Sequence, residues 1–285
     1  MTKKGYLVLD SIVKNNKFCL IDFVCIGKDS KLDNDFCNEL TDLCVKNNIN
    51  YYYKDSIDLK EKNSEFYIAI SWKWIIDLPN LIILHDSLLP KYRGFSPLVN
   101  MLINGEKKFG VTAIYATNEY DKGDVIKQEA IEVNYPKKIT NLIDEISLLY
   151  AKIVLFLFDK MAKKEKIIGI KQKESEATYS VWLNGDDYFI DWNWKADKIK
   201  RKIDACCSPY EGAKCRINDE VVIITDADIV ADVKVENRMP GKVLFIKDDY
   251  PIVICGEGLL QIKKAIYKNS SKMLLPLNNF RIKFE

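Results

Sequence analysis

Apolar runs of strand length alternate with segments of helical periodicity through the first 170 residues. The strand-like runs are LIDFVCIG (20–27), EFYIAIS (65–71), NLIILHDS (80–87) and GVTAIYAT (110–117). Apolar residues recur at helical spacing in DFCNELTDLCVKNN (35–48), SPLVNMLINGE (96–106) and a long segment, 138–165. Strands and helices in alternation predict an α/β domain with a mostly parallel, doubly wound sheet.

The pattern changes after about residue 170. The segment IKQKESEATYS (170–180) is polar and suits a linker, and KADKIKRKIDAC (195–206) predicts one amphipathic helix. Short strand-like runs follow: AKCRI (213–217), EVVIITDADIV (220–230), GKVLFIK (241–247), PIVICG (251–256) and LLQIKKAIY (259–267). We therefore expect two domains. Residues 1–175 form the catalytic α/β domain, and residues 176–285 form a helix followed by a small closed or half-closed β-barrel that is similar to an OB-fold.

The N-terminal segment leaves two interpretations open. A doubly wound domain normally opens with an apolar strand, and GYLVLD (5–10) could be that strand. The same residues also look like the helix that would follow a strand absent from this chain. The segment lacks the features of a signal peptide, and no window is long and apolar enough for a membrane span, so we expect a soluble cytoplasmic protein.

The charge and the cysteine content of the chain bear on nucleic-acid binding, metal binding and disulfide formation. The 43 Lys and Arg against 41 Asp and Glu give a net charge of +2, which does not indicate nucleic-acid binding. The eight cysteines include no Cys-x-x-Cys pair, and the chain has a single histidine. This pattern disfavours a zinc site or a disulfide framework, so we expect reduced thiols and no metal.

That histidine, His85, ends a strand-like run and precedes a turn. It should therefore lie at the carboxyl edge of the sheet, where open α/β folds bind ligands. The loop EYDKGDV (119–125) also follows a strand, and its Gly123 allows a tight turn that could bring Asp121 or Asp124 to the same edge. A structural histidine and turn-capping carboxylates remain the alternative.

The residues around His85 resemble one known family. HDSLLPKYRG (85–94) and NGEKKFGVTAIYATNEYDKGDVI (104–126) are similar to the folate-dependent formyltransferases. The resemblance rests on the His-x-Ser-Leu-Leu-Pro turn, the Arg-Gly pair, the Gly-Val-Thr strand and the Asp-x-Gly-Asp loop. It continues in 177–213 and 239–265, which look like the C-terminal barrel of family members that act on tRNA or sugars.

The resemblance implies formyl transfer from N10-formyltetrahydrofolate to an amine. It assigns His85 to the oxyanion and to proton transfer, and Asp121 to holding the imidazole. It also implies that three segments wall the folate pocket, although the tryptophans could instead be core residues. These segments are Trp72, Lys73 and Trp74; Ser87, Leu88, Leu89 and Pro90; and Thr117, Asn118, Glu119 and Tyr120.

The acceptor amine is less well defined by the sequence. The region 27–44 is acidic to neutral and shows no basic loop for a polyanion, which favours a small acceptor, a nucleotide-linked amino sugar, over tRNA. We expect the acceptor to contact Arg93, Gly94 and Tyr210. The segment that contains Tyr210, 206–219, resembles a segment of the sugar-specific enzymes, but an ordinary turn between a helix and a barrel would explain its sequence equally well. Methionyl-tRNA remains the alternative acceptor, and the resemblance allows a homodimer.

One position departs from the family pattern. The family has Asn-x-His, whereas this chain has Ile83-Leu84-His85, and isoleucine cannot donate a hydrogen bond to an oxyanion. Loss of one such donor typically lowers the rate by about 10²- to 10³-fold. Either another group replaces it, with Asn80 and Ser71 as candidates, or the chain is a folate-binding homologue with lost or hydrolytic activity.

Overall fold

The computed structural model describes residues 3–29, 34–74, 76–277 and 279–285. These residues form two compact units. The first contains 1–97, 108–132 and 142–180, and the second contains 98–107, 133–141 and 181–285. Each unit is described by itself below.

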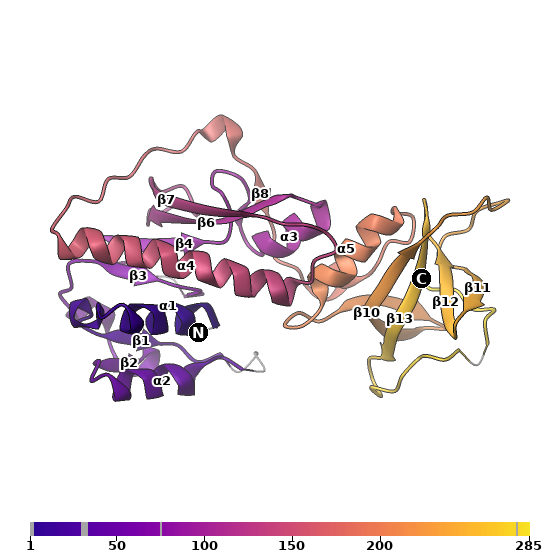
Figure 1. The fold of residues 1–285 in the computed structure, drawn as a ribbon, viewed down its shortest axis with the longest axis horizontal. Helices are drawn as coiled ribbons and strands as arrows, with labels where there is room; N and C mark the ends of the chain where they lie inside the picture. Colours follow the sequence, from indigo (N-terminus) through magenta and orange to yellow (C-terminus); the bar gives the residue numbers. More distant parts are fainter. Residues whose placement is uncertain (1–2, 30–33, 75, 278) are drawn as a thin grey trace. The chain divides into compact units, whose positions relative to one another are not determined.

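The described residues of the first unit form three sheets (Figure 1). A two-stranded parallel sheet pairs β1 (Val24–Ile26) with β2 (Tyr51–Tyr53). A four-stranded sheet has the order β3-β4-β6-β7, with β3 (Tyr67–Ala69), β4 (Leu81–His85), β6 (Lys108–Tyr115) and β7 (Val125–Glu132). The β3–β4 pair is parallel, and β6 and β7 are antiparallel to their neighbours. The α/β class is confirmed, but the four-stranded sheet is mixed rather than mostly parallel, since two of its three described pairings are antiparallel.

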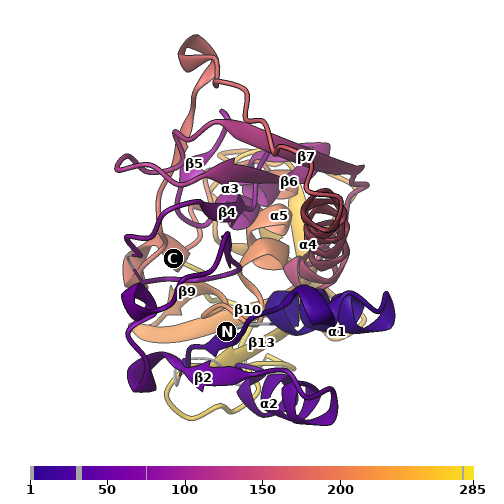
Figure 2. The ribbon, with the colours of Figure 1, turned by 90° about the vertical axis from the view of Figure 1, so that its left-hand side faces the viewer.

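Three described helices accompany these strands: α1 (Lys3–Lys14), α2 (Cys37–Lys46) and α4 (Ile139–Ala162), of which α4 lies in this unit from Leu142 onward. In both ribbon views α1 lies beside α4 (Figures 1 and 2). Lys3 of α1 pairs with Asp144 of α4 at 2.6 Å, and Lys17, three residues beyond the end of α1, pairs with Asp159 of α4 at 2.5 Å. Helix α1 buries Val8, Leu9 and Ile12 on one face.

Helix α1 answers the question left open at the N-terminus. Residues 5–10 are helical, so the interpretation of GYLVLD as the opening strand is wrong. The buried residues of α1 follow a spacing of three to four, which favours a helix over the period of two that a strand requires.

The core of the first unit places His85 at the sheet edge. Strand β4 buries Leu81, Ile82 and Leu84, and β6 beside it is buried at Phe109, Val111, Ala113 and Ile114. Because β4 has apolar neighbours on both sides, its position is fixed up to its last residue, His85.

The segment 170–180, expected to be a linker, belongs to the first unit. Ile170 bridges to Val125 at the start of β7. Strand β8 (Tyr179–Ser180) then pairs in parallel with β5 (Arg93–Gly94). The backbone hydrogen bonds of this segment therefore hold the residues just after the His85 turn.

The second unit contains α3 (Pro97–Asn104, from Leu98 onward), α5 (Ala196–Cys206) and a five-stranded antiparallel sheet of order β11-β12-β13-β10-β9. The strands are β9 (Ala213–Ile217), β10 (Glu220–Val230), β11 (Val243–Lys247), β12 (Tyr250–Ile254) and β13 (Leu259–Tyr267). All five strand-like runs of the sequence are thus confirmed. Within the part of the chain described, β11 and β9 are the edge strands of this sheet and do not pair with each other, so closure into the expected barrel stays a prediction. None of the described helices is long and apolar enough to cross a membrane.

Candidate active site

His85 and Asp121 come together at the carboxyl edge of β4, as the sequence predicts. His85 is 8% exposed, and its Nδ1 lies 3.4 Å from Oδ1 of Asp121. Its Nε2 lies 2.8 Å from the carbonyl oxygen of Tyr92. Both ring nitrogens thus face oxygen acceptors, and only a ring that carries a proton on each nitrogen donates in both directions.

Asp121 is held by the backbone as well as by the ring. Its Oδ2 accepts a 2.7 Å hydrogen bond from the Gly94 N–H, and its own backbone is left-handed, with φ of +55°. Aspartate tolerates this conformation better than most residues. Gly94, at φ +97°, has no room for a side chain, since a Cβ there would lie 2.6 Å from the Ser180 carbonyl oxygen. The Arg-Gly pair therefore positions the carboxylate next to His85.

The turn after His85 is fixed by buried polar groups. Ser87 is fully buried and donates to the Lys91 carbonyl oxygen at 2.6 Å. Thr112 of β6 donates to the Ser87 carbonyl oxygen at 2.6 Å and accepts from the Leu89 N–H at 3.1 Å. Gln128 of β7 donates to the Leu89 carbonyl oxygen at 2.9 Å. This network gives the turn one conformation, which a rigid ligand-binding loop needs.

Arg93 is buried, at 1% exposure, and its donors are used within the chain. Nη1 donates to both Glu174 oxygens at 2.9 Å, and Nη2 donates to Oε1 of Gln172 at 2.9 Å. The hydrogen bond from Arg93 is the first cause that lowers the pKa of Glu174. A substrate-binding role for Arg93 stays a prediction; in this structure it ties β5 to the 172–174 segment.

Sequence reasoning missed Gln172. Its Nε2 donates to the backbone carbonyl oxygens of Asp121, at 2.7 Å, and Gly123, at 2.8 Å, while its Oε1 accepts from Arg93. Gln172 therefore joins the Asp121 loop to the buried guanidinium. In the sequence, Gln172 is only one residue of a polar segment. That pattern does not distinguish an amide that holds a loop in place from a solvated residue of a linker.

A half-buried carboxylate next to His85, that of Asp86, was also missed. Asp86 accepts hydrogen bonds from Tyr150 of α4 at 2.8 Å and from Lys4 of α1 at 2.5 Å. Burial, and then the charge of Asp86, raise the pKa of Tyr150 well above its usual value. These contacts anchor the N-terminal end of α1 at the carboxyl edge of the sheet.

The segment of Trp72, Lys73 and Trp74 follows β3 at the same edge. The two indole rings lie 4.9 Å apart in an edge-to-face arrangement, and Lys73 pairs with Asp29 at 2.6 Å. Trp74 packs on Gly27, where a Cβ would lie 2.4 Å from the ring. The expected folate contact of this segment stays a prediction.

The loop from Thr117 to Tyr120 is exposed except where it joins Asp121. Thr117 accepts at Oγ1 from the Glu119 N–H at 3.4 Å, and the same hydroxyl donates to the Glu119 carbonyl oxygen at 2.9 Å. The exposed Tyr120 ring lies 6.1 Å from the half-exposed Phe95 ring. These two rings present an aromatic surface next to the His85–Asp121 pair.

Position 83 is half-buried in β4, between Ala69 of β3 and Ile114 of β6. Asn80 donates to the Glu65 carbonyl oxygen at 3.1 Å at the amino end of β4, about 16 Å along the strand from His85. The interpretation of Asn80 as a replacement oxyanion donor is therefore wrong. Ser71 lies two residues beyond Ala69, at the same edge as His85, and stays a candidate.

Tyr210 belongs to the second unit, in the turn between α5 and β9, where its N–H donates to the Cys207 carbonyl oxygen at 3.1 Å. Its substrate contact stays a prediction. Across the described ranges, no group of three or more His, Cys, Asp and Glu side chains is arranged to hold a metal ion.

Sequence comparison connects the site to known proteins. Residues 65–155 match the family described as formyl transferase, and residues 183–280 match its C-terminal domain. A methionyl-tRNA formyltransferase of Caldanaerobacter subterraneus is 33% identical over 236 residues, which cover 80% of this chain and 74% of that protein. Another from Thermodesulfovibrio yellowstonii is 35% identical over 211 residues, with 72% and 66% covered.

Solved structures share the fold at lower identity. An N-formyltransferase of Helicobacter canadensis, in complex with folinic acid and dTDP-3-aminofucose, superposes with a TM-score of 0.65 at 19% identity, over 92% of this chain and 95% of that one. HypX of Aquifex aeolicus gives a TM-score of 0.66 at 19% identity, with 91% of this chain and 49% of that chain covered. The chain thus spans about half the length of HypX.

Proposed function

The chain belongs to the folate-dependent formyltransferase superfamily, and from this membership we propose that it transfers a formyl group from N10-formyltetrahydrofolate to a nucleotide-linked amino sugar. The observation that carries the proposal is the His85–Asp121 pair at the carboxyl edge of β4. It brings together the two residues that the family pattern assigns to the reaction.

In this reaction the acceptor amine attacks the formyl carbon, the bond from that carbon to N10 breaks, and the amine proton passes to N10. His85 stabilises the negative charge on the formyl oxygen and moves the proton. Asp121 fixes the ring through Nδ1, and Gly94 fixes Asp121. To reach a substrate through Nε2, His85 exchanges its contact with the Tyr92 carbonyl oxygen for one with the ligand.

The residues at this edge fit a folate in two respects. The turn at 87–91 is rigid, which suits backbone recognition of a pterin, and the exposed Tyr120 and Phe95 rings offer a surface for a flat ring system. Trp72, Lys73, Trp74 and the loop 117–120 complete the proposed folate contacts. Arg93, Gly94 and Tyr210 remain the proposed acceptor contacts.

Support for the sugar acceptor comes from the low net charge and from the Helicobacter canadensis N-formyltransferase, whose complex contains dTDP-3-aminofucose. The sequence relatives named methionyl-tRNA formyltransferase favour a second candidate acceptor, initiator tRNA.

One experiment separates these candidates. The protein is incubated with N10-formyltetrahydrofolate and either a panel of amino-sugar nucleotides or methionyl-tRNA, and N-formyl product, tetrahydrofolate and formate are measured together. We expect product with an amino-sugar nucleotide, with a KM that rises only modestly between low and physiological salt. Formylation of methionyl-tRNA alone, with strongly salt-dependent binding, would reverse the choice of acceptor. Formate without product would indicate hydrolysis.

A further inference from the structure

Helix α4 buries a tyrosine hydroxyl against the end of β4, next to His85. Tyr150 is 2% exposed, and its hydroxyl lies 2.8 Å from Oδ1 of Asp86 and 3.2 Å from the carbonyl oxygen of Leu84. A phenol has one proton, so the hydroxyl shares that proton between two acceptors. These acceptors belong to the residues directly before and directly after His85.

The carbonyl group of Leu84 points away from β6. The carbonyl oxygen of Leu81 accepts from the N–H of Ala116, the residue that follows β6, and backbone groups alternate in direction along a strand. The Leu84 carbonyl group, three residues further on, therefore points to the β3 side. The pairing of β4 with β3 ends at Ile83. The hydroxyl of Tyr150 thus supplies a donor to β4 just past the point where its pairing with β3 ends.

Asp86 is held by a second helix as well. Lys4 of α1 is buried and donates to Oδ2 of Asp86, and its ammonium group lies 5.2 Å from the centre of the Tyr150 ring. Each helix therefore uses one oxygen of the carboxylate. Rotation of the Asp86 carboxylate away from Tyr150 would also break this ion pair, and a buried ammonium group without a partner is costly. The contact between Asp86 and Tyr150 is therefore fixed from two sides.

The contacts of the His85 ring itself hold it less firmly. The distance from Nδ1 to Oδ1 of Asp121 is 3.4 Å, which is longer than the roughly 2.9 to 3.0 Å of a usual N–H···O hydrogen bond. The contact of Nε2 with the Tyr92 carbonyl oxygen is the one that the proposed mechanism releases when a substrate binds. During the reaction the position of the ring therefore depends on the position of its own backbone.

The Tyr150 hydroxyl stays protonated and so remains a donor. Burial, then the charge of Asp86, raise the pKa of Tyr150 well above its usual value, and the charge of Asp121 raises it further. The influence of Asp121 on this pKa also places the hydroxyl within electrostatic reach of the carboxylate that contacts the His85 ring.

We propose that Tyr150 is a positioning residue for His85: its hydroxyl holds the backbone on both sides of the histidine and so keeps the ring beside Asp121 when Nε2 releases the Tyr92 carbonyl oxygen. The effect on catalysis rests on the proposed function, because it requires His85 to act on the formyl group. The effect on the ring itself does not, so the two effects can be tested separately.

The test observes the His85 ring by NMR. His85 is the single histidine of the chain, so the ring signals of protein labelled with carbon-13 at histidine are assigned without ambiguity. Tyr150→Phe removes the hydroxyl and keeps the aromatic ring in α4. We expect the Cε1–H and Cδ2–H signals of His85 to broaden by about twofold or more, because a ring that is held less firmly exchanges between environments.

The same variant is measured in the formyl-transfer assay. We expect Tyr150→Phe to lower kcat by about tenfold and to change KM for N10-formyltetrahydrofolate by less than about twofold, because a misplaced catalytic group affects the chemical step rather than binding.

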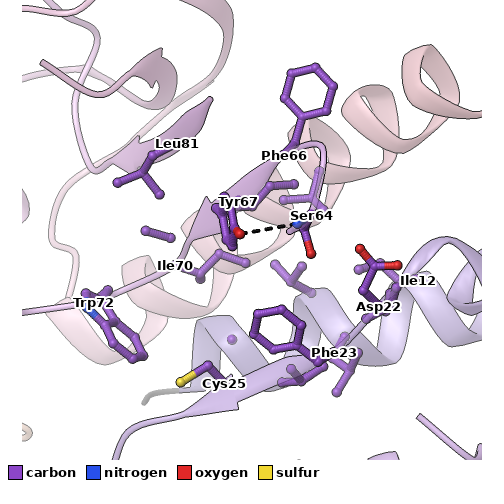
Figure 3. A pocket seen from close by; sticks show the side chains of 18 of the residues that line it. Ile12, Asp22, Phe23, Cys25, Ser64, Phe66, Tyr67, Ile70, Trp72 and Leu81 are labelled. Atoms are coloured by element: carbon purple, nitrogen blue, oxygen red, sulfur yellow. Dashed lines mark hydrogen bonds between the residues drawn. The ribbon is translucent and has the colours of Figure 1, made fainter. Parts of the chain in front are cut away.

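Tyr67→Phe is the matched control. The Tyr67 hydroxyl donates to the Lys62 carbonyl oxygen and accepts from the Ser64 N–H at 3.2 Å (Figure 3). Tyr67 pairs with Leu81 at the opposite end of β4, about 13 Å along the strand from His85. Its substitution also removes one tyrosine hydroxyl from the first unit, but it should leave the ring signals of His85 and kcat unchanged.

A second pair of variants covers the case in which Tyr150→Phe does not fold. Asp86→Asn and Asp86→Ala both remove the charge beside Lys4, but only Asn keeps an oxygen acceptor for the Tyr150 hydroxyl. We expect broader His85 signals and a lower kcat in Asp86→Ala than in Asp86→Asn, because the acceptor rather than the charge holds the hydroxyl in place.

The proposal requires changes in both the ring and the rate. It is overturned if either the His85 signals or kcat of Tyr150→Phe stay at the wild-type values, if Tyr67→Phe has the same effects, or if the two Asp86 variants behave alike. If the wild-type protein transfers no formyl group, the proposed function fails, and the NMR comparison still decides whether Tyr150 holds the ring.

Discussion

His85 is the side chain on which the proposed chemistry depends most directly. Replacing it with Asn keeps a polar group of similar reach but removes proton transfer. We expect His85→Asn to lower kcat by about 10³-fold or more, with Kd for tetrahydrofolate nearly unchanged, because the imidazole acts on the transition state. Single-turnover kinetics with folate binding by calorimetry checks this. Near-normal turnover would remove His85 from the mechanism.

Asp121 acts through His85 rather than on the substrate. Asp121→Asn retains the shape and an oxygen for the Gly94 N–H but removes the charge beside Nδ1. We expect kcat to fall by about 10- to 100-fold with a smaller change in KM. Steady-state kinetics, with Asp124→Asn as the matched loop control, measures the difference. Equal effects of the two substitutions would mean that Asp121 is only a turn residue.

A substitution at Ile83 tests whether the site has all the oxyanion donors that it needs. Ile83→Asn restores the family residue but places an amide between Ala69 and Ile114. We expect a loss of about 1 to 3 kcal/mol in the free energy of unfolding with no gain in kcat. Denaturant unfolding and kinetics are measured on the same preparations, with Ile83→Val as the control. A large rate gain without destabilisation would instead show a site that lacks one oxyanion donor.

At the scale of elements, the 170–180 segment holds the Asp121 loop in place through the hydrogen bonds of Gln172. Gln172→Leu removes two donors to the loop backbone and the acceptor for Arg93. We expect kcat to fall by about tenfold or more and the unfolding free energy to fall by about 1 to 3 kcal/mol. Lys171→Gln, at the exposed neighbouring position, is the control. Loss of stability with unchanged kcat would limit Gln172 to a structural role.

The elements that the sequence predicts correctly are those with a strong period. Helix α4 and strands β4 and β6 are apolar at regular spacing and form the core, so their type could be read directly. Strand β7 was missed because Lys127, Gln128 and Glu129 interrupt its apolar pattern. Its position is set by pairing with β6, a long-range contact with little local signal.

For the site, too, residues with a local sequence signal could be predicted and residues placed by long-range contacts could not. His85 and Asp121 could be predicted because each follows a recognisable strand, and their motifs are specific. Gln172, Tyr150 and Lys4 could not, because their roles depend on which loop or helix end lies next to them. Asn80 seemed close to His85 in sequence, but an extended strand separates the two residues.

At the scale of the whole molecule, the chain combines a formyl transferase domain with the C-terminal domain of the same family. The central claim is that formyl groups reach an amine rather than water. The most direct measurement is the ratio of N-formyl sugar-nucleotide product to tetrahydrofolate released, followed by mass spectrometry in one reaction. We predict a ratio of about one, abolished in His85→Asn, because each transfer breaks one bond to N10 and forms one amide. Tetrahydrofolate release matched by formate, or no release with any amine acceptor, would contradict the account.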